Sequence, residues 1–466
     1  MAILTTVSNP PPIRNNKHYY ELTRCTCLCT LPSMKYHPIT DTFKLLPQQR
    51  ALLDSPEFAH VYPSLDDYLN KMARDGIAAR KDLALLLHFL VSVVGNSKGT
   101  QMRFRNEAER FVLFCWNEKH KSILELDTED IRDYIDWIWS PPKALISDTT
   151  IASRFKAKAG SDIRTVNKTW RPFVLRQSKA NRKTNEFISP ERSSLDKPKS
   201  RYSLNQTSLQ NSYASLNVFL KELWGSEHIA RNPISLVKKS CKYMVKGNIY
   251  KPPHTLDDET WQLFVDTLTL AADENPAYEM HRFLVLTLKV LFLRISELSH
   301  RDYYTPIFGH FRQDSSGEGW VLNIIGKGKK ERLVTVPDEF IDNVLIRYRE
   351  SLGLSPLPHI DENTPIMPSQ KTGQPLHQDS LNNMVEEAFN LVIKSLVKKE
   401  KKEQAHAIAG SSSHWLRHTG ATQALGEISE TMLAEELGHA SVKTTVEVYV
   451  APAHRDRIKK GVSRKL

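Results

Sequence analysis

Two long stretches of helical periodicity, divided by a basic segment with a double proline, constrain the fold of this chain most. Apolar residues recur at helical spacing from Leu65 onward, and again four and three apart between Leu209 and Leu223. The segment KKSCKYMVKGNIYKPPH then ends the pattern, because proline cannot continue a helix. With 466 residues the chain is long enough for more than one core. We therefore expect two domains joined by this segment.

The pattern predicts four regions. Residues 1–60 are rich in proline, asparagine and threonine without a sustained period, which favours an N-terminal arm of unknown role. Residues 61–240 are predicted to form a helical domain, interrupted by a basic insertion at about 141–203. Residues 241–254 are the expected linker, and residues 255–466 the second domain with a C-terminal tail.

The charge balance favours a polyanionic partner. The chain has 64 Lys and Arg against 53 Asp and Glu, a net charge of +11 and a pI of about 9.2. From Ile151 to Tyr202 there are 14 Lys and Arg against 4 acids, with Trp170, Phe173 and Phe187 among them. Such a mixture suits a groove that follows DNA phosphates, and a solvated insertion loop is an equally good interpretation. The candidate DNA contacts are Arg154, Lys156, Lys158, Arg164, Lys168 and Arg171.

The sequence predicts a cytoplasmic protein with no membrane partner. It has no apolar run of about 18 residues and begins without the features of a secretion signal. Its five cysteines are odd in number, which fits a reducing compartment. Cys25, Cys27 and Cys29 lie too close together for the usual zinc spacing, so we favour a short strand or arm and expect no metal there.

The second domain contains several separate candidate motifs. In HRFLVLTLKVLFLRISELSHRDY, an apolar stripe from Leu284 to Leu298 predicts one buried amphipathic helix. Arg294 lies at the flank of that stripe, and Glu297 is placed to orient it. When this motif is taken alone, a purely structural ion pair is the better explanation. The segment GWVLNIIGKGKKERLVTVP predicts a β-hairpin with Lys327 near its tip.

Two further motifs follow the hairpin. In SSSHWLRHTGATQAL, His414 and Arg417 are three apart and share a helical face behind a serine N-cap, as a phosphate site needs. We interpret the adjacent His418 as a packing or supporting residue. In ISETMLAEELGHASVKTTVEVYVAP, a helix should end at Gly438, with His439 just beyond it and Tyr449 near the end of a second helix.

Together these motifs carry a resemblance. LRISEL, the GKG hairpin lysine, HWLRH, LGH and a tyrosine shortly after, in that order, resemble the tyrosine recombinases, including the Xer, Cre and phage-integrase members. The resemblance covers residues 255–466 and extends more loosely over about 60–240, where it resembles the family's core-binding domain. It implies a mainly α fold with a small β-sheet, in which a helical core-binding domain and an α+β catalytic domain form a C-shaped clamp on DNA.

The resemblance also implies roles for individual residues. Arg294 and Arg417 would bind the non-bridging oxygens of the scissile phosphate, and His414 and His439 would complete that cage. Lys327 would protonate the departing 5′ oxygen, and Tyr449 would form a 3′-phosphotyrosyl link. Phosphoryl transfer needs mainly positioning and charge stabilisation, so no metal or other cofactor is expected. A tyrosine is a poor nucleophile at neutral pH, so either nearby cations must favour its phenolate or a neighbour must accept its proton, and His414 is our candidate acceptor.

The chain departs from the family pattern at one point in the first motif, where Phe292 and Leu293 stand where relatives often have a glycine. The expected partners are double-stranded DNA sites and further copies of this chain, as a tetramer on two paired sites. An accessory protein or a second recombinase is a further open partner. A type IB topoisomerase, a non-catalytic DNA-binding relative and a helical scaffold are the alternatives. The target sequence, and integration versus excision, inversion or resolution, cannot be read from these residues.

Overall fold

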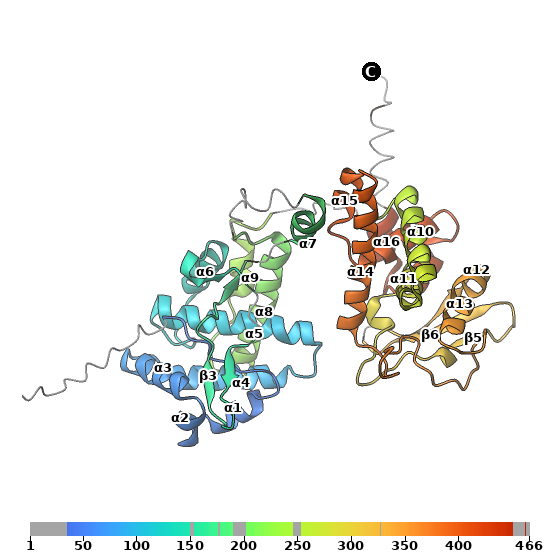
Figure 1. Ribbon diagram of the computed structural model, residues 1–466. Coiled ribbons are helices and arrows are strands. Elements are labelled where there is room, and N and C mark those ends of the chain that lie inside the picture. Colours follow the sequence, from blue (N-terminus) through green and yellow to red (C-terminus); the bar gives the residue numbers. More distant parts are fainter. Residues whose placement is uncertain are drawn as a thin grey trace, which may run out of the picture. The chain divides into compact units, whose positions relative to one another are not determined.

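The computed structural model describes residues 35–149, 153–175, 178–189, 202–245, 253–326, 328–450 and 462. Contacts divide the chain into two compact units, which are described separately below (Figure 1). The N-terminal unit comprises residues 1–147, 151–173 and 204–241, and the C-terminal unit comprises residues 148–150, 174–203 and 242–466. The described residues of both units are mainly helical with small sheets, which confirms the predicted fold class. None of the described helices is long and apolar enough to cross a membrane.

The N-terminal unit is a helical bundle in which α4, α5 and α8 pack on one another. The apolar stripe predicted between Leu209 and Leu223 lies on α8 and is buried. The helices and turns of this unit are α1 Leu46–Leu52, α2 Glu57–Val61, α3 Pro63–Arg74, α4 Ala79–Ser92, α5 Lys98–Phe114, η1 Cys115–Lys119, α6 Thr128–Trp139, η2 Lys143–Leu145, α8 Gln206–Gly225 and α9 Ile234–Lys239. Its strands are β1 Ile146–Ser147, β2 Phe155–Ala157, β3 Arg164–Val166 and β4 Phe173–Val174; of the last strand, Phe173 belongs to this unit and Val174 to the C-terminal unit.

Residues 35–60 belong to this bundle, so the predicted arm is wrong for that part of 1–60. Ile39 is fully buried, and helix α1 packs on α4. The carboxylate of Glu109 on α5 accepts hydrogen bonds from the backbone nitrogens of Ile39 and Thr40, at 2.9 and 3.0 Å. The segment is therefore held by bonds to a buried carboxylate, which leave no periodic pattern in the sequence. Cys25, Cys27 and Cys29 lie outside the described residues.

The insertion predicted at about 141–203 is not one piece, because its two halves belong to different units. Strands β2 and β3 form an antiparallel pair in the N-terminal unit, with Phe155 opposite Val166. Helix α7 (Lys179–Lys183) and the π-helical turn η3 (Thr184–Ile188) belong to the C-terminal unit, where they contact α14 (Gln378–Lys398) and α15 (Lys402–Ile408).

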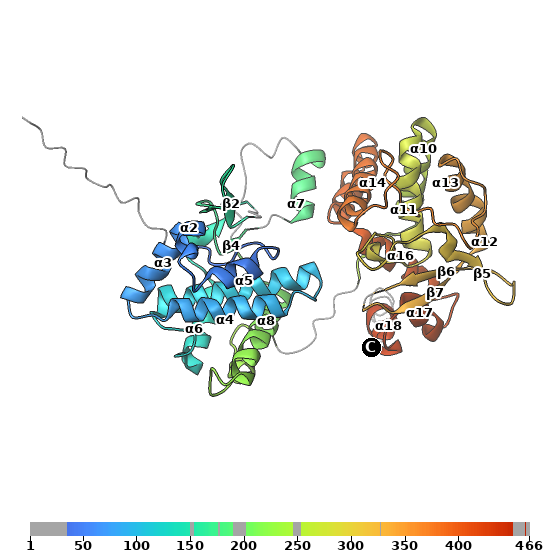
Figure 2. The ribbon, with the colours of Figure 1, turned by 90° about the horizontal axis from the view of Figure 1, so that it is seen from below.

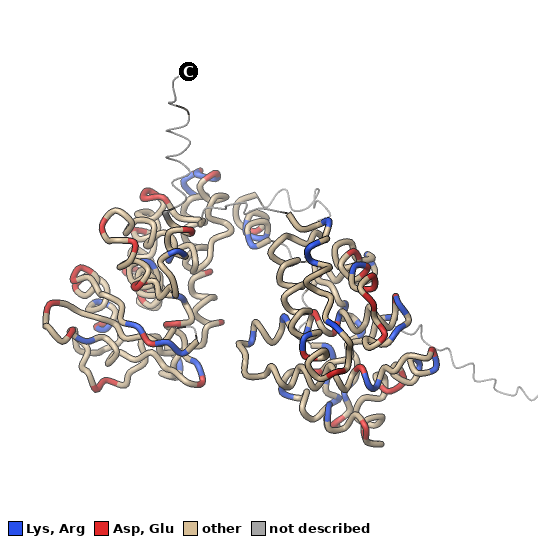
Figure 3. The backbone as a smooth tube through the Cα atoms, turned by 180° about the vertical axis from the view of Figure 1, so that it is seen from behind, with Lys and Arg blue, Asp and Glu red and all other residues tan. Residues whose placement is uncertain are grey.

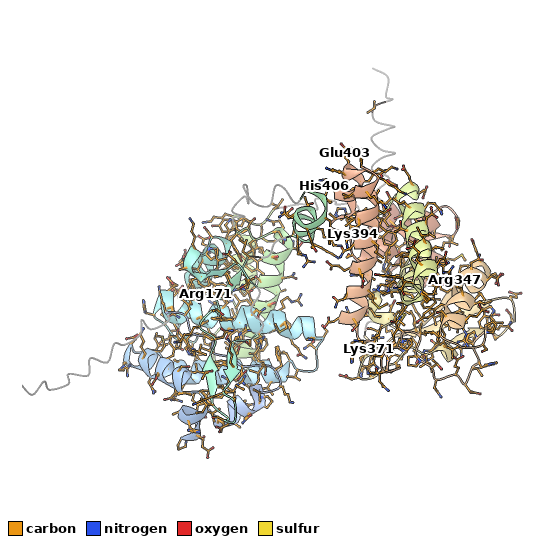
Figure 4. The ribbon with its side chains drawn as sticks, in the orientation of Figure 1. Arg171, Arg347, Lys371, Lys394, Glu403 and His406 are labelled. Carbon is orange, nitrogen blue, oxygen red and sulfur yellow. The ribbon has the colours of Figure 1, made fainter. Side chains whose placement is uncertain are left out.

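Apolar and polar contacts hold α7 and η3 in the C-terminal unit. Ile188 is part of its hydrophobic core. Lys394 of α14 places its Nζ 5.2 Å from the ring of Phe187, and His406 of α15 lies 3.2 Å from the Thr184 hydroxyl; both residues lie beside α7 in Figure 4. The second half of the insertion is thus a structural element of the C-terminal unit.

The C-terminal unit is built around α11 (Glu279–Val290). Helices α10 (Asp258–Glu274), α14 and α16 (Ser413–Ala424) pack on it, and α10 and α14 flank it in both ribbon views (Figures 1 and 2). The other helices and turns are η5 Pro276–Tyr278, η6 Ile295–Glu297, η7 Phe308–His310, α12 Asp338–Phe340, η8 Ile341–Leu345, α13 Ile346–Ser351, α17 Glu430–Leu437, α18 Val442–Thr445 and η9 Val446–Val450.

The predicted hairpin is present and forms part of a three-stranded antiparallel sheet. Strand β6 (Trp320–Ile325) pairs with β5 (Phe311–Gln313) on one side and with β7 (Glu331–Val336) on the other. Its register sets Leu322 opposite Val334 and Ile324 opposite Arg332. Strand alternation therefore puts Arg332 on the same inward face as the buried Val334. Helix α17 lies against β7 (Figure 2).

The single helix predicted through LRISEL is wrong. Helix α11 ends at Val290, and the chain then turns into the short 3₁₀ helix η6. Phe292 has a φ of +49°, a left-handed conformation that ends a right-handed helix. The apolar stripe is buried all the same, on both sides of the break: Leu284, Leu288, Leu291, Ile295 and Leu298.

Lys183 of α7 gives a test of this packing. Its side chain is 1% exposed, and its Nζ has no hydrogen-bond partner among the described residues. Burial, with a smaller contribution from the charge of the nearby Lys179, lowers the pKa of Lys183 from 10.5 to about 8. The unfolded chain thus binds this proton more tightly than the folded one, so stability should rise between about pH 8 and 10.5.

We expect Lys183→Met to stabilise the C-terminal unit at neutral pH by up to about 3 kcal/mol. The variant should also lose the increase in stability with pH that wild type shows above about pH 8. Scanning calorimetry at pH 7 and pH 10 measures both effects. Lys179→Met is the matched control, because Lys179 lies 3.3 Å from Glu386 and is partly exposed. A Lys183→Met variant less stable than wild type at pH 7 would contradict the prediction.

Candidate active site

Arg294 and Glu297 face each other in the turn that follows α11. Glu297 is 0% exposed and accepts hydrogen bonds from the backbone nitrogen of Arg294 at 2.7 Å and from its Nη1 at 3.1 Å. The Arg294 side chain is 28% exposed. The carboxylate thus orients a guanidinium that remains partly open to solvent.

The close approach of α16 to the end of α11 requires Gly420. A β-carbon there would lie 2.0 Å from the carbonyl oxygen of Lys289 and 3.0 Å from Cδ1 of Phe292. Phe292 is itself strained, because left-handed backbone disfavours side chains other than those of glycine and asparagine. Its ring packs against the small cluster of Ala421, Leu433, Leu437 and Tyr449, which offsets part of that strain.

Arg417 is held at the centre of the site by backbone carbonyls. It is 3% exposed and donates hydrogen bonds to the carbonyl oxygens of Phe292 and, at 2.5 Å, of Leu437. Its Nη1 lies 3.9 Å from Glu297 Oε2. Burial and the charge of Arg294 lower the pKa of Arg417 to about 10, so it stays charged at neutral pH. The site therefore keeps two guanidinium charges close together.

Tyr449 is hydrogen bonded to His418, whereas the sequence favoured His414 as the proton acceptor and His418 as a packing residue. The Tyr449 hydroxyl lies 2.8 Å from Nδ1 of His418. Turn η9 brings the tyrosine against the face of α16 that also carries Ala421, three residues after His418. His414 is exposed one turn earlier, with its ring centroid 6.4 Å from that of His418.

Burial sets the protonation of the tyrosine and of the three histidines. Tyr449 is 5% exposed, and burial raises its pKa while the charges of Arg417 and Arg294 oppose that rise. Burial, with help from nearby cations, lowers the pKa of His418 and of His439 to about 4. The pKa of His414 is also lowered, by desolvation of the part of its exposed ring that faces the protein and by the charges of Arg417 and Arg294. At neutral pH the site thus holds a protonated phenol beside neutral imidazoles.

His439 also lies close to the ring of Tyr449. It follows Gly438, which ends α17 in the left-handed conformation that the sequence predicts. Its Nδ1 lies 2.8 Å from the Thr445 hydroxyl, and its ring is nearly parallel to that of Tyr449 at a centroid distance of 6.3 Å. Thr445 therefore fixes the orientation of this imidazole.

The structure brings together five of the six predicted catalytic residues: Arg294, His414, Arg417, His439 and Tyr449. Lys327 lies outside the described residues. The described ends of its hairpin are joined by a hydrogen bond of 2.8 Å from the Gly326 nitrogen to the Lys330 carbonyl. Two cations and several neutral imidazoles around one phenol can bind a phosphate-like anion and accept a proton.

Arg332 is the residue that the sequence prediction missed. It donates to both oxygens of Glu297, at 2.5 and 3.0 Å. A signal was present, because Arg332 shares the inward face of its strand with Val334 and Val336. An arginine at a core position needs a buried partner, and Glu297 is that partner.

The predicted DNA contacts divide into buried and exposed residues. Arg154 bonds to Glu109 at 2.5 Å and Arg164 to both oxygens of Asp41 at 2.7 Å, so both guanidiniums serve the fold of the N-terminal unit. Arg171 bonds to backbone carbonyls, including that of Lys168 at 2.9 Å. Lys156, Lys158 and Lys168 are exposed. Figure 3 shows Lys and Arg interspersed with Asp and Glu in both units.

Three solved structures illustrate what the chain is similar to. The XerH site-specific recombinase bound to palindromic difH substrate is 15% identical over 92% of this chain and 99% of that chain, with a TM-score of 0.44. The Tn1549 transposon integrase in complex with a circular intermediate DNA is 16% identical over 80% of this chain and 99% of that chain, with a TM-score of 0.42. A lambda integrase dimer bound to a COC′ core site is 12% identical over 78% of this chain and 96% of that chain, with a TM-score of 0.39. No curated protein matches the chain.

The family model described as the phage integrase family matches residues 264–455. This range begins within α10 and contains every candidate catalytic residue, from Arg294 to Tyr449. The three similarities above are distant, so the family assignment depends on this match. Residues 264–455, which carry the candidate catalytic residues, therefore match the phage integrase family, the tyrosine recombinases.

Proposed function

We propose that this chain is a site-specific DNA recombinase whose nucleophile is Tyr449. The observation that carries the proposal is the buried Tyr449 hydroxyl, 2.8 Å from a neutral imidazole and close to the charges of Arg417 and Arg294. A phenol with a raised pKa is a poor nucleophile unless a base takes its proton as the new bond forms. The family match over residues 264–455 supports the same assignment.

In the proposed reaction, the Tyr449 oxygen forms a bond to the scissile phosphorus and the bond from phosphorus to the 5′ oxygen breaks. His418 takes the phenolic proton, and Lys327 gives a proton to the departing 5′ oxygen. Arg294 and Arg417 bind the non-bridging oxygens, with His414 and His439 beside them. The 3′-phosphotyrosyl link conserves the bond energy, so rejoining needs no ATP and the steps require no metal.

We further propose that the two units bind opposite faces of double-stranded DNA as a clamp and that four copies act on two paired sites. Exposed Lys156, Lys158 and Lys168 are the remaining candidates for phosphate contacts in the N-terminal unit. Integration, excision or resolution of a mobile element or replicon is the expected outcome.

Covalent adducts test the proposal. The protein is expressed in cells, denatured quickly, and the DNA attached to it is recovered and sequenced, with Tyr449→Phe and Tyr278→Phe in parallel. Tyr278 is the matched control because its hydroxyl bonds to Glu387. We expect adducts at one or a few sites in wild type and Tyr278→Phe, and none in Tyr449→Phe. Adducts without site preference indicate a topoisomerase, and their absence from wild type indicates a non-catalytic relative.

The pH dependence of cleavage tests His418 as the base. Because the pKa of His418 is lowered to about 4, it is ready to accept a proton throughout the neutral range. Cleavage of the recovered duplex, measured as kcat/KM, should therefore fall only as the pH approaches about 4. We expect His418→Ala to slow cleavage by roughly 10² to 10⁴ and to abolish this acidic limb. If His414→Ala abolishes the limb and His418→Ala keeps it, His414 is the base.

A further inference from the structure

We propose that Arg332 is a positioning residue that neutralises the buried Glu297 and thereby keeps the positive charges of Arg294 and Arg417 available to the DNA phosphate. The inference rests on the proposed function and adds a residue to the same site. Arg332 belongs to the hairpin strand β7 and is 12% exposed, too buried to be a general surface contact.

The contact between Arg332 and Glu297 has the geometry of a strong ion pair. Nη1 and Nη2 of Arg332 meet Oε1 and Oε2 of Glu297 at 2.5 and 3.0 Å, a two-point contact that fixes the carboxylate plane. Burial alone would raise the pKa of Glu297, but the hydrogen bond and charge of Arg332 lower it below its ordinary value, with smaller help from Arg417. Arg332 is thus the main partner of this carboxylate.

Arg332 also sets the end of helix α17. Its Nε donates to the carbonyl oxygen of Glu436 at 3.2 Å, while Arg417 donates to the next carbonyl, that of Leu437. The two arginines thereby satisfy successive carbonyls in the last turn of one helix, where cations are favoured. A β-carbon on Gly438 would lie 2.9 Å from Cδ of Arg332. His439 follows directly, so its backbone position depends on this contact.

The charges around Glu297 show how the loss of Arg332 would affect the binding of the phosphate. Without Arg332, the cations that remain close to the buried carboxylate among the described residues would be Arg294, at 3.1 Å, and Arg417, at 3.9 Å. An unpaired buried charge attracts whatever cation is near. Both guanidiniums would then be drawn toward Glu297 and compete less well for the phosphate. With Arg332 in place, one cation balances the carboxylate and two remain for a phosphodiester.

The first test compares Arg332→Met, Arg332→Lys and Arg347→Met on the duplex recovered from wild-type adducts. Arg347 is the matched control, because its Nε donates at 2.8 Å to Glu279, another buried glutamate of the same unit. We expect Arg332→Met to lower the single-turnover rate of adduct formation roughly 10²-fold with little change in DNA affinity. Arg332→Lys should recover part of that loss, and Arg347→Met should cleave like wild type.

A double variant separates positioning from a general structural role. If Arg332 acts by neutralising Glu297, adding Glu297→Gln to Arg332→Met removes the unbalanced charge and should restore part of the lost rate. An equal rate in Arg332→Met and Arg347→Met, or a double variant slower than Arg332→Met, would overturn the proposal.

Unfolding measurements test the pairing independently of activity. Because the folded pKa of Glu297 is lowered, its pairing stabilises the protein above the ordinary pKa of 4.5, and this stability is lost as pH falls through the folded pKa. The stability gap between wild type and Arg332→Met should therefore be largest near pH 7 and narrow below about pH 4.5. A gap independent of pH would overturn the pairing. If wild type forms no adducts, the proposed function fails. The unfolding measurement then still tests whether Arg332 pairs with Glu297, because it does not depend on activity.

Discussion

The arrangement of the candidate active site depends on the contacts of the buried Glu297 carboxylate with three arginines. The carboxylate joins the turn after α11 to the hairpin strand β7 through Arg294 and Arg332, and it lies close to Arg417 on α16. Placing one anion among three guanidiniums allows several cations to lie close together in a buried setting, where they would otherwise repel one another. The positive charge of the site is therefore a consequence of how these three segments are packed.

The position of Tyr449 follows from the same packing. Gly420 allows α16 to approach α11, Arg417 then bonds to carbonyls at the ends of α11 and α17, and η9 places the tyrosine on the resulting surface. Burial makes the phenol reluctant to ionise and keeps the adjacent imidazoles neutral. In this state the phenol stays protonated and is a poor nucleophile. A bound anion would change the electrostatic potential at the tyrosine and at the neighbouring imidazoles.

The sequence predicted the elements of the C-terminal unit better than the contacts among them. The hairpin, the shared helix of His414 and Arg417 and the left-handed Gly438 followed from local patterns that the structure retains. The break at Phe292 was missed because an apolar stripe continues through it. The hydrogen bond between His418 and Tyr449 was not predicted, because the two residues are 31 positions apart in the sequence. The buried pairs of Arg154 and Arg164 likewise depend on distant acids.

Helix α7 has a consequence for how the protein can be divided. Helix α7 and the following turn η3 precede α8 and α9 in the chain, yet Ile188 and Phe187 of η3 contribute to the core of the C-terminal unit. A fragment that begins at the linker near residue 253 would contain every candidate catalytic residue but would expose the apolar side chains of α14 and α15 that this segment covers. Exposed patches of this kind promote aggregation. The two halves of the protein are interleaved in sequence, so neither can be excised as a single uninterrupted piece.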